Sequence, residues 1–149
     1  MIRIRRAEPG DVPAVAALER LCFSDAWSET SVKGTLESPL GYLLIAEEEG
    51  AEAAGAAGCL IAQILEDEGE LLRIAAAPGK RRKGIGDALL RRMLEDHPAV
   101  GIWRLDVRTK NGAAIALYEK YGFRIAAENA DVYRDPKDNG YLMIRGGAD

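Results

Sequence analysis

The sequence has little of what marks a secreted, metal-binding or membrane protein. Its two cysteines, Cys22 and Cys59, lie far apart without a metal-ligand spacing, so neither a disulfide framework nor a zinc site is expected. No apolar run approaches the roughly 20 residues that span a bilayer, and the first residues contain no signal-peptide core. We therefore expect a cytoplasmic protein without a transmembrane helix.

Charge and composition indicate a small globular protein rather than a nucleic-acid binder. Of the 149 residues, 48% are hydrophobic and 30% are charged, and the formal net charge is −4. An acidic chain is not expected to bind nucleic acid through its overall charge. No repeat or linker divides the sequence, so we expect a single domain over residues 1–149 with one core.

The spacing of apolar residues predicts an α/β protein. Alternation predicts strands at residues 2–5, 42–47, 56–64, 71–76 and 102–108, with strand-like segments near 123 and 141. Helical spacing predicts a helix from residue 12, a short helix after the loop 25–31, and helices at 85–97 and 113–120. Hairpins combined with one strand–helix–strand crossover predict a mixed sheet flanked by helices.

The first predicted helix is amphipathic. Val12, Val15, Leu18 and Leu21 recur at three-residue spacing and are expected to form its apolar face. Asp11 directly precedes them and is the expected N-cap.

The most informative stretch runs from residue 71 to residue 90. A strand-like segment leads to Pro78-Gly79, four cations (Lys80 to Lys83), the turn Gly84-Ile85-Gly86, and a helical pattern. Glycines let the backbone approach a ligand closely, and the N–H groups and positive dipole end of the next helix attract an anion. This order predicts a phosphate site, to which the four cations add charge. The spacing fits neither G-x-G-x-x-G nor a P-loop.

Residues 81–86, Arg-Arg-Lys-Gly-Ile-Gly, fit the pattern Q/R-x-x-G-x-G/A. They resemble the acetyl-coenzyme A pyrophosphate loop of the GNAT superfamily of N-acetyltransferases. Three further segments carry the resemblance: Ala26-Trp27-Ser28-Glu29, Leu105-Asp106-Val107-Arg108, and NGAAIALYEKYGF from Asn111 to Phe123. Within the superfamily, the chain is most similar to the ribosomal-protein-alanine N-acetyltransferases, the RimI type.

The resemblance implies acetyl-coenzyme A as co-substrate, without a metal, and the GNAT fold, a mostly antiparallel mixed sheet whose two central parallel strands splay apart. The backbone of Ile74, Ala75 and Ala76 would pair with the pantetheine arm as an added strand does. Alternatively, these three residues are only a buried strand. The implied cofactor-binding residues are Ile74, Ala75, Ala76, Arg81, Arg82, Lys83, Gly84, Ile85, Gly86, Asp87, Asn111 and Tyr118.

Asp87 departs from the family pattern, in which a cation or a small hydroxyl residue is usual at this position. A carboxylate is favourable at a helix N-terminus but would repel a bound diphosphate. We therefore expect the Asp87 side chain to point away from the diphosphate.

The resemblance also implies direct attack of an amine on the thioester, with Asp106 as proton acceptor and Tyr118 as proton donor. Proton transfer from a phenol of pKa about 10 to a thiolate near 8.5 is uphill by only about 2 kcal/mol. The alternative for Tyr118 is a tyrosine that packs its ring in the core. Asn111 lies about two helical turns before Tyr118, so both side chains are expected on one helix face.

Asp106 stands where the family has glutamate. Its carboxylate is shorter by about one methylene, so a bridging water is expected. Alternation places Arg104 and Arg108 on the same face, where they favour the ionised form, and the alternative is an ion-paired surface carboxylate. A weak base suits an α-amine, which costs about 1 kcal/mol to deprotonate at pH 7, better than a lysine amine at about 4.6 kcal/mol.

The predicted acceptor side resembles the family less closely. The resemblance places Trp27 in the acceptor-binding loop, although a tryptophan here can equally fill the core. Tyr133 matches one of two adjacent tyrosines that line a peptide groove, and Val132 replaces the other. His97, the only histidine, is expected at a helix end without a catalytic role.

Together these features predict a monomeric or weakly dimeric N-acetyltransferase that acts on the N-terminal α-amino group of a ribosomal protein beginning with alanine. Three alternatives stay open: acetylation of a small amine or a lysine, a catalytically idle acyl-coenzyme A-binding module, and nucleic-acid binding through residues 80–83. The acidic charge and the lack of an aromatic platform disfavour the last. No membrane partner is expected.

Overall fold

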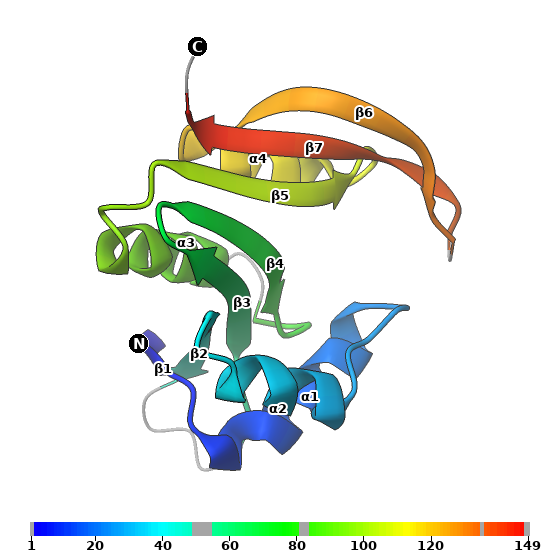
Figure 1. The fold of residues 1–149 in the computed structure, drawn as a ribbon. Helices are drawn as coiled ribbons and strands as arrows, with labels where there is room; N and C mark the ends of the chain where they lie inside the picture. Colours follow the sequence, from blue (N-terminus) through cyan, green and yellow to red (C-terminus); the bar gives the residue numbers. More distant parts are fainter. Residues whose placement is uncertain (1, 49–54, 81–83, 135, 148–149) are drawn as a thin grey trace.

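The computed structural model describes residues 2–48, 55–80, 84–134 and 136–147, which form a seven-stranded sheet with helices against both faces (Figure 1). The predicted α/β class is confirmed. In chain order the elements are β1 (Ile2–Arg6), the 3-10 helix η1 (Pro9–Asp11), α1 (Val12–Cys22), α2 (Glu29–Glu37), β2 (Gly41–Glu48), β3 (Gly58–Leu65), β4 (Glu68–Ala76), α3 (Ile85–Asp96), β5 (Ile102–Arg108), α4 (Gly112–Lys120), β6 (Arg124–Tyr133) and β7 (Asp138–Gly146).

The sheet divides at its single parallel pair of strands. The spatial order is β1-β2-β3-β4-β5-β7-β6, and every neighbouring pair is antiparallel except β4 and β5. These two strands are paired only from Glu68–Ile102 to Leu71–Leu105, although both continue further. Figure 1 shows the group β5, β7 and β6 standing apart from the group β1 to β4. The predicted splay of the central strands is therefore confirmed.

A bulge in β4 lies at the point where the strands diverge. Ile61 of β3 pairs with Arg73, whereas the next residue, Ala62, pairs with Leu71. Leu72 is thus an extra residue on β4, and an extra residue bends the strand that carries it. The bend directs the end of β4 away from β5.

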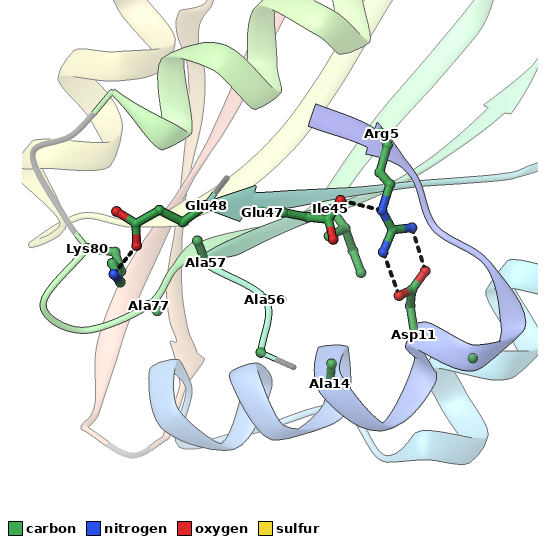
Figure 2. A pocket seen from close by; sticks show the side chains of 12 residues that line it. Arg5, Asp11, Ala14, Ile45, Glu47, Glu48, Ala56, Ala57, Ala77 and Lys80 are labelled. Atoms are coloured by element: carbon green, nitrogen blue, oxygen red, sulfur yellow. Dashed lines mark hydrogen bonds and ion pairs between the residues drawn. The ribbon is translucent and has the colours of Figure 1, made fainter. Parts of the chain in front are cut away.

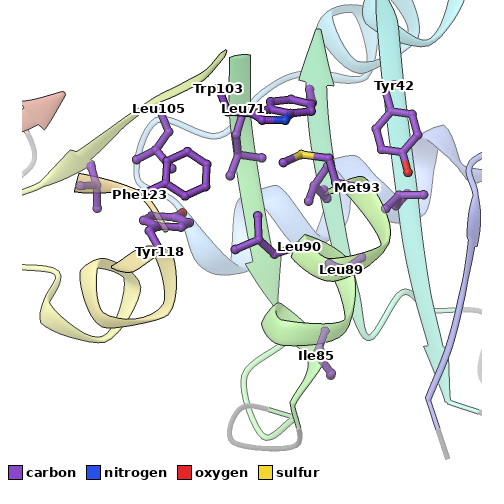
Figure 3. Close-up of a cluster of buried hydrophobic side chains, with 14 of the residues drawn as sticks. Tyr42, Leu71, Ile85, Leu89, Leu90, Met93, Trp103, Leu105, Tyr118 and Phe123 are labelled. Atoms are coloured by element: carbon purple, nitrogen blue, oxygen red, sulfur yellow. The ribbon is translucent and has the colours of Figure 1, made fainter. Parts of the chain in front are cut away.

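Apolar side chains cover both faces of the sheet. The cluster beneath α3 and α4 is shown in Figure 3, where Leu89, Leu90 and Met93 of α3 meet Trp103 and Leu105 of β5. On the opposite face, α1 and α2 pack on a second cluster, whose buried members are Val12, Val15, Leu18, Val32, Leu43, Ile45, Cys59, Ile61 and Ala75. The sheet therefore lies between two apolar layers, as its two-residue alternation requires.

One expectation for α1 was wrong, and the expected N-cap residue is confirmed in position only. Leu21 is 67% exposed, because each three-residue step along a helix falls about 60° short of a full turn. A series that starts on the buried face at Val12 has therefore turned to the solvent side at Leu21. Asp11 occupies the N-cap position but makes no side-chain cap, since its carboxylate accepts hydrogen bonds from both Nη atoms of Arg5 and from the Glu8 N–H.

The other predicted elements are present with shifted ends. The strand-like segments near 123 and 141 are β6 and β7, which form a long antiparallel hairpin. Along β6 all residues before Tyr133 are exposed. None of the helices in the described ranges has the length and apolar character needed to cross a membrane.

Candidate active site

The divergence of β4 and β5 creates a cleft of about 700 Å³. Residues 70–76 of β4 form one wall and residues 105–108 of β5 form the other. The N-terminal turn of α3, residues 84–87, and one side of α4 close one face. Tyr133 of β6 and residues of the segment after α1, Phe23 and Asp25, border the other side. The cleft thus brings together segments far apart in the sequence.

Most of the predicted site residues line this cleft. They are Ile74, Ala75, Ala76, Gly84, Ile85, Gly86, Asp87, Asp106, Asn111, Tyr118 and Tyr133. Trp27 is not among the lining residues; its half-buried side chain packs against the cluster beneath α1 and α2. Arg81, Arg82 and Lys83 lie outside the described residues.

The wall formed by β4 offers an unoccupied strand edge. β3 pairs with β4 along its whole length, from Leu65–Glu68 to Gly58–Ala76, whereas β5 pairs with β4 only as far as Leu71. Within the described part of the chain, no strand pairs with residues 72–76 on the side of β5. Such an edge presents backbone N–H and C=O groups to an extended ligand.

The helix α3 begins at the mouth of the cleft with a backbone turn that requires glycine. Gly84 is the N-cap residue, with φ of 75° in the left-handed region, and no side chain caps the helix there. The side chain of Ile85 is buried and anchors the turn. A Cβ added to Gly86 would come within 3.0 Å of Leu117 Cδ2, so glycine permits the close approach of α4. The first N–H groups of α3 are therefore held at the cleft.

Asp87 turns its carboxylate toward α4. Its Oδ1 lies 2.5 Å from Lys120 Nζ and accepts a hydrogen bond from the Tyr121 hydroxyl at 3.1 Å. The hydrogen bond from Lys120 lowers the pKa of Asp87, against a smaller opposing effect of burial. The negative charge at the helix start is thereby offset by a neighbouring ammonium group.

Tyr118 lies deep in the cleft. Its side chain is 6% exposed and its ring packs against Phe123, with centroids 5.9 Å apart. Burial raises the pKa of Tyr118 well above its ordinary value, and the nearby Tyr133 adds to the shift. The phenol therefore stays protonated far above neutral pH, while the raised pKa makes proton transfer to a thiolate more uphill than the roughly 2 kcal/mol of an ordinary phenol.

Asn111 lies at the start of α4. It is the N-cap of α4, with non-helical backbone, and its side-chain oxygen accepts a hydrogen bond from the Ala114 N–H at 3.2 Å. Asn111 therefore directly precedes the first helical residue, Gly112. Asn111 and Tyr118 both line the cleft, as the two-turn spacing predicted.

Asp106 is exposed on β5 at the same cleft. Within the described residues its carboxylate makes no hydrogen bond or ion pair. Arg104 instead pairs with Glu68 at 3.1 Å, and Arg108 lies over the Tyr133 ring at 4.3 Å and donates to the Pro136 carbonyl. Burial raises the pKa of Tyr133, and the charge of Asp106 adds to that shift. Asp106 and Tyr133 are therefore electrostatic neighbours.

Sequence reasoning missed a buried ion pair beside the cleft. The Glu19 side chain is completely buried, and its Oε1 lies 2.6 Å from Arg73 Nη2. The same oxygen accepts the Trp27 N–H at 2.9 Å. Burial lowers the pKa of Arg73, but Glu19 outweighs this effect and the pKa is raised. One signal was available, because Glu19 follows Val12 by seven residues, two helical turns, and so shares its buried face.

A second pocket, of about 410 Å³, lies between the end of β2 and the start of α1 (Figure 2). Its charged side chains bind one another: Arg5 pairs with Asp11 and Glu47, and Lys80 pairs with Glu48. Lys80 therefore belongs to this pocket and not to the cleft, which corrects the expectation that its charge serves the phosphate site. The cleft is the better candidate for chemistry.

A mixed sheet opened at one parallel pair, with a glycine turn and a helix N-terminus at the mouth, is the architecture of coenzyme A-dependent acyltransferases. A family model of the acetyltransferase (GNAT) family matches residues 12–123, and the chain belongs to this family. It is accordingly an acyltransferase of the acetyl-coenzyme A-dependent type.

Curated relatives agree over nearly the whole chain. The [ribosomal protein bS18]-alanine N-acetyltransferase of Escherichia coli K12 is 34% identical over 149 residues, covering 96% of each chain. The N-alpha-acetyltransferase RimI of Mycobacterium tuberculosis is 31% identical, over 93% of this chain and 89% of its own. The chain is therefore similar to the RimI type, as its motifs indicated.

Solved structures match the fold equally well. The crystal structure of the ribosomal-protein-S18-alanine N-acetyltransferase from Escherichia coli superposes with a TM-score of 0.88 at 29% identity, covering 98% of this chain and 94% of that one. Arabidopsis thaliana NAA60 in complex with acetyl-CoA reaches a TM-score of 0.87 at 17% identity, over 98% of each chain. The second likeness concerns the fold alone.

Proposed function

We propose that this protein transfers the acetyl group of acetyl-coenzyme A to the N-terminal α-amino group of a protein. The observation that carries the proposal is the cleft, where the open edge of β4, the N-terminus of α3, Asp106 and Tyr118 meet. By analogy with the curated relatives, the acceptor is a ribosomal protein that begins with alanine.

The cleft suits the shape and charge of the co-substrate. The pantetheine arm carries amides, and residues 72–76 of β4 offer an edge without a partner strand within the described residues. The diphosphate is an anion, and the first N–H groups of α3, at Ile85 and Gly86, lie at a positive helix pole. Asp87 does not oppose this placement strongly, because Lys120 offsets its charge.

The reaction needs two proton movements. The neutral amine nitrogen attacks the thioester carbonyl carbon, the carbon–sulfur bond breaks, and an amide forms. Asp106, directly or through a water molecule, takes the proton that the amine gives up, and Tyr118 donates a proton to the departing thiolate. Because burial keeps Tyr118 protonated, it remains a donor throughout the neutral and mildly alkaline range.

The exposed position of Asp106 favours an α-amine as acceptor. An α-amino group has a pKa of about 7.7 to 8.0, so a weak base such as a short aspartate is enough to deprotonate it. A lysine amine of pKa about 10.4 requires a stronger base. Acetylation of a small amine or a lysine is the competing candidate, and an idle acyl-coenzyme A-binding module is a further one.

A peptide panel separates these candidates. The purified protein is incubated with acetyl-coenzyme A and peptides that begin with alanine, serine or methionine, with the same peptides blocked at the N-terminus, with an internal-lysine peptide, and with small primary amines. We expect mass spectrometry to find acetylation of free N-termini, alanine first, and none of blocked peptides. Acetylation of blocked lysine peptides or of small amines alone would contradict the proposal, and so would coenzyme A binding without any turnover.

A further inference from the structure

The buried ion pair between Glu19 and Arg73 joins three segments that meet beside the cleft. Glu19 comes from α1 and Arg73 from β4, and the third segment is the chain from Phe23 to Trp27. Arg73 donates to Glu19 through both Nε and Nη2, at 3.1 and 2.6 Å. This two-atom contact fixes the guanidinium plane as well as its position.

Both side chains contact the segment from Phe23 to Trp27, in addition to the packing of Phe23 and Trp27 on the cluster beneath α1 and α2. Arg73 Nη2 donates to the Asp25 carbonyl at 3.2 Å and lies 3.5 Å from the Asp25 carboxylate. Its guanidinium carbon lies 3.9 Å from the Phe23 ring centroid and 5.8 Å from that of Trp27. Glu19 in turn accepts the Trp27 N–H. One cation and one carboxylate thus contact three residues of a segment that lies between two helices.

The location of Arg73 connects this segment to the reacting groups. Arg73 follows the bulge of β4 and directly precedes residues 74–76, which line the cleft. Its side chain lies on the sheet face of α1, the same face as the Asp106 side chain, whereas Leu71, Leu105 and Tyr118 belong to the cluster on the opposite face. An amine that reaches Asp106 therefore approaches past Arg73, Phe23 and Asp25.

We propose that Arg73, anchored by Glu19, is a positioning residue for the acceptor: it holds residues 23–27 against the edge of β4 and so shapes the entrance through which the amine reaches Asp106. This role rests on the proposed function, because it assumes that an amine acceptor enters the cleft past residues 23–27. It requires the paired, forked geometry of an arginine, because a lysine keeps the charge but offers no fork to reach Glu19 and the Asp25 carbonyl together. Arg73 itself is not expected to touch the reacting atoms.

The test compares Arg73→Lys with the double variant Glu19→Gln/Arg73→Met, which removes both charges and so leaves no unpaired ion in the protein interior. The matched control is Arg104→Lys, because Arg104 also pairs with a glutamate, Glu68 of β4, but in an exposed contact. Each variant is tested with the acceptor that the wild type acetylates best, and hydrogen exchange is followed in peptides that cover residues 23–28.

For both Arg73 variants we expect the KM for the acceptor to rise about tenfold or more, with kcat and the Kd for acetyl-coenzyme A changed by less than about threefold, because the entrance is displaced while the thioester site is kept. The selectivity between peptides that differ in their first residue should fall as well. Exchange over residues 23–28 should accelerate, and Arg104→Lys should match the wild type in every measurement.

Two results would overturn the proposal: an unchanged acceptor KM in folded Arg73 variants, or unchanged exchange over residues 23–28. A fall in thermal stability with the acceptor KM preserved would assign the ion pair a purely structural role and also overturn it. If the wild type acetylates no amine, the proposed function fails, and the exchange measurement alone then decides whether Arg73 holds the segment.

Discussion

Leu71 of β4 and Leu105 of β5 form the last paired position of the two parallel strands. Both side chains are buried in the same cluster, so this end of the pairing is fixed by packing beneath α3 and α4. The next residue of β4, Leu72, is the bulged one. The cleft therefore begins where a well-packed pair is followed by a residue that breaks the register, and Asp106 is the first residue of β5 beyond that point.

Replacing Tyr118 with phenylalanine tests the proton donor. The ring still fills its place beside Phe123, so the thermal unfolding midpoint should stay near that of the wild type. Loss of the donated proton should lower kcat by about 100-fold, the lower end of what a positioned acid contributes. Calorimetry should find unchanged acetyl-coenzyme A affinity, and full activity of Tyr118→Phe would remove Tyr118 from the mechanism.

The pH dependence of the reaction follows from the same burial. With a peptide acceptor, kcat/KM should rise up to about pH 8, as the α-amine loses its proton. Because burial raises the pKa of Tyr118 above its ordinary value of 10.0, the rate should not fall again below pH 10. Initial rates between pH 6 and 10.5 measure the expected rise and show whether the rate falls again at alkaline pH. A decline already between pH 8 and 9 would identify a different essential acid.

Asp106 can be tested in two directions. Asp106→Glu restores the longer side chain of the family and should raise kcat by a few-fold, about 1 kcal/mol in the barrier, because the carboxylate then reaches the amine without a bridging water. Asp106→Asn should lower kcat/KM most strongly below pH 7, where the amine is mostly protonated. If Asp106→Asn matches the wild type at pH 6.5, the base lies elsewhere in the cleft.

Asp87→Ser tests the charge at the start of α3. The exposed contact with Lys120 contributes little, so the free energy of unfolding at pH 7 should stay close to that of the wild type. The pKa of Asp87 is lowered in the folded protein, so this contribution exists above the unfolded pKa and disappears as the pH falls. Titration calorimetry should find tighter coenzyme A binding, because a negative charge near the diphosphate is removed. Weaker binding would place the diphosphate away from this turn.

The ion pair of Glu19 and Arg73 also has a consequence for stability. Arg73→Met leaves a buried carboxylate without its cation and should lower the free energy of unfolding by about 3 to 5 kcal/mol. Glu19→Gln/Arg73→Met should cost clearly less, because a glutamine oxygen still accepts the Trp27 N–H and no ion is left unpaired. Urea unfolding of both variants gives the comparison, and equal losses would mean that the desolvated charge is not the cause.

Sequence patterns predicted the order of strands and helices because alternation and helical spacing depend on neighbours along the chain. The motifs predicted the splay, and Tyr118 and Asp106 as residues of one cleft, because the resemblance supplied the long-range arrangement. The expected burial of Leu21 was wrong, because a three-residue repeat drifts around a helix. The partners of Lys80, Asp87 and Arg73 could not be predicted, since each lies on another element.

A crystal structure with acetyl-coenzyme A tests the central claim most directly. We expect the pantetheine arm alongside residues 72–76 of β4, the diphosphate on the main-chain amides of Ile85 and Gly86, and the thioester between Asp106 and Tyr118. A structure in which those amides contact only protein and the co-substrate lies outside the cleft between β4 and β5 would contradict the account.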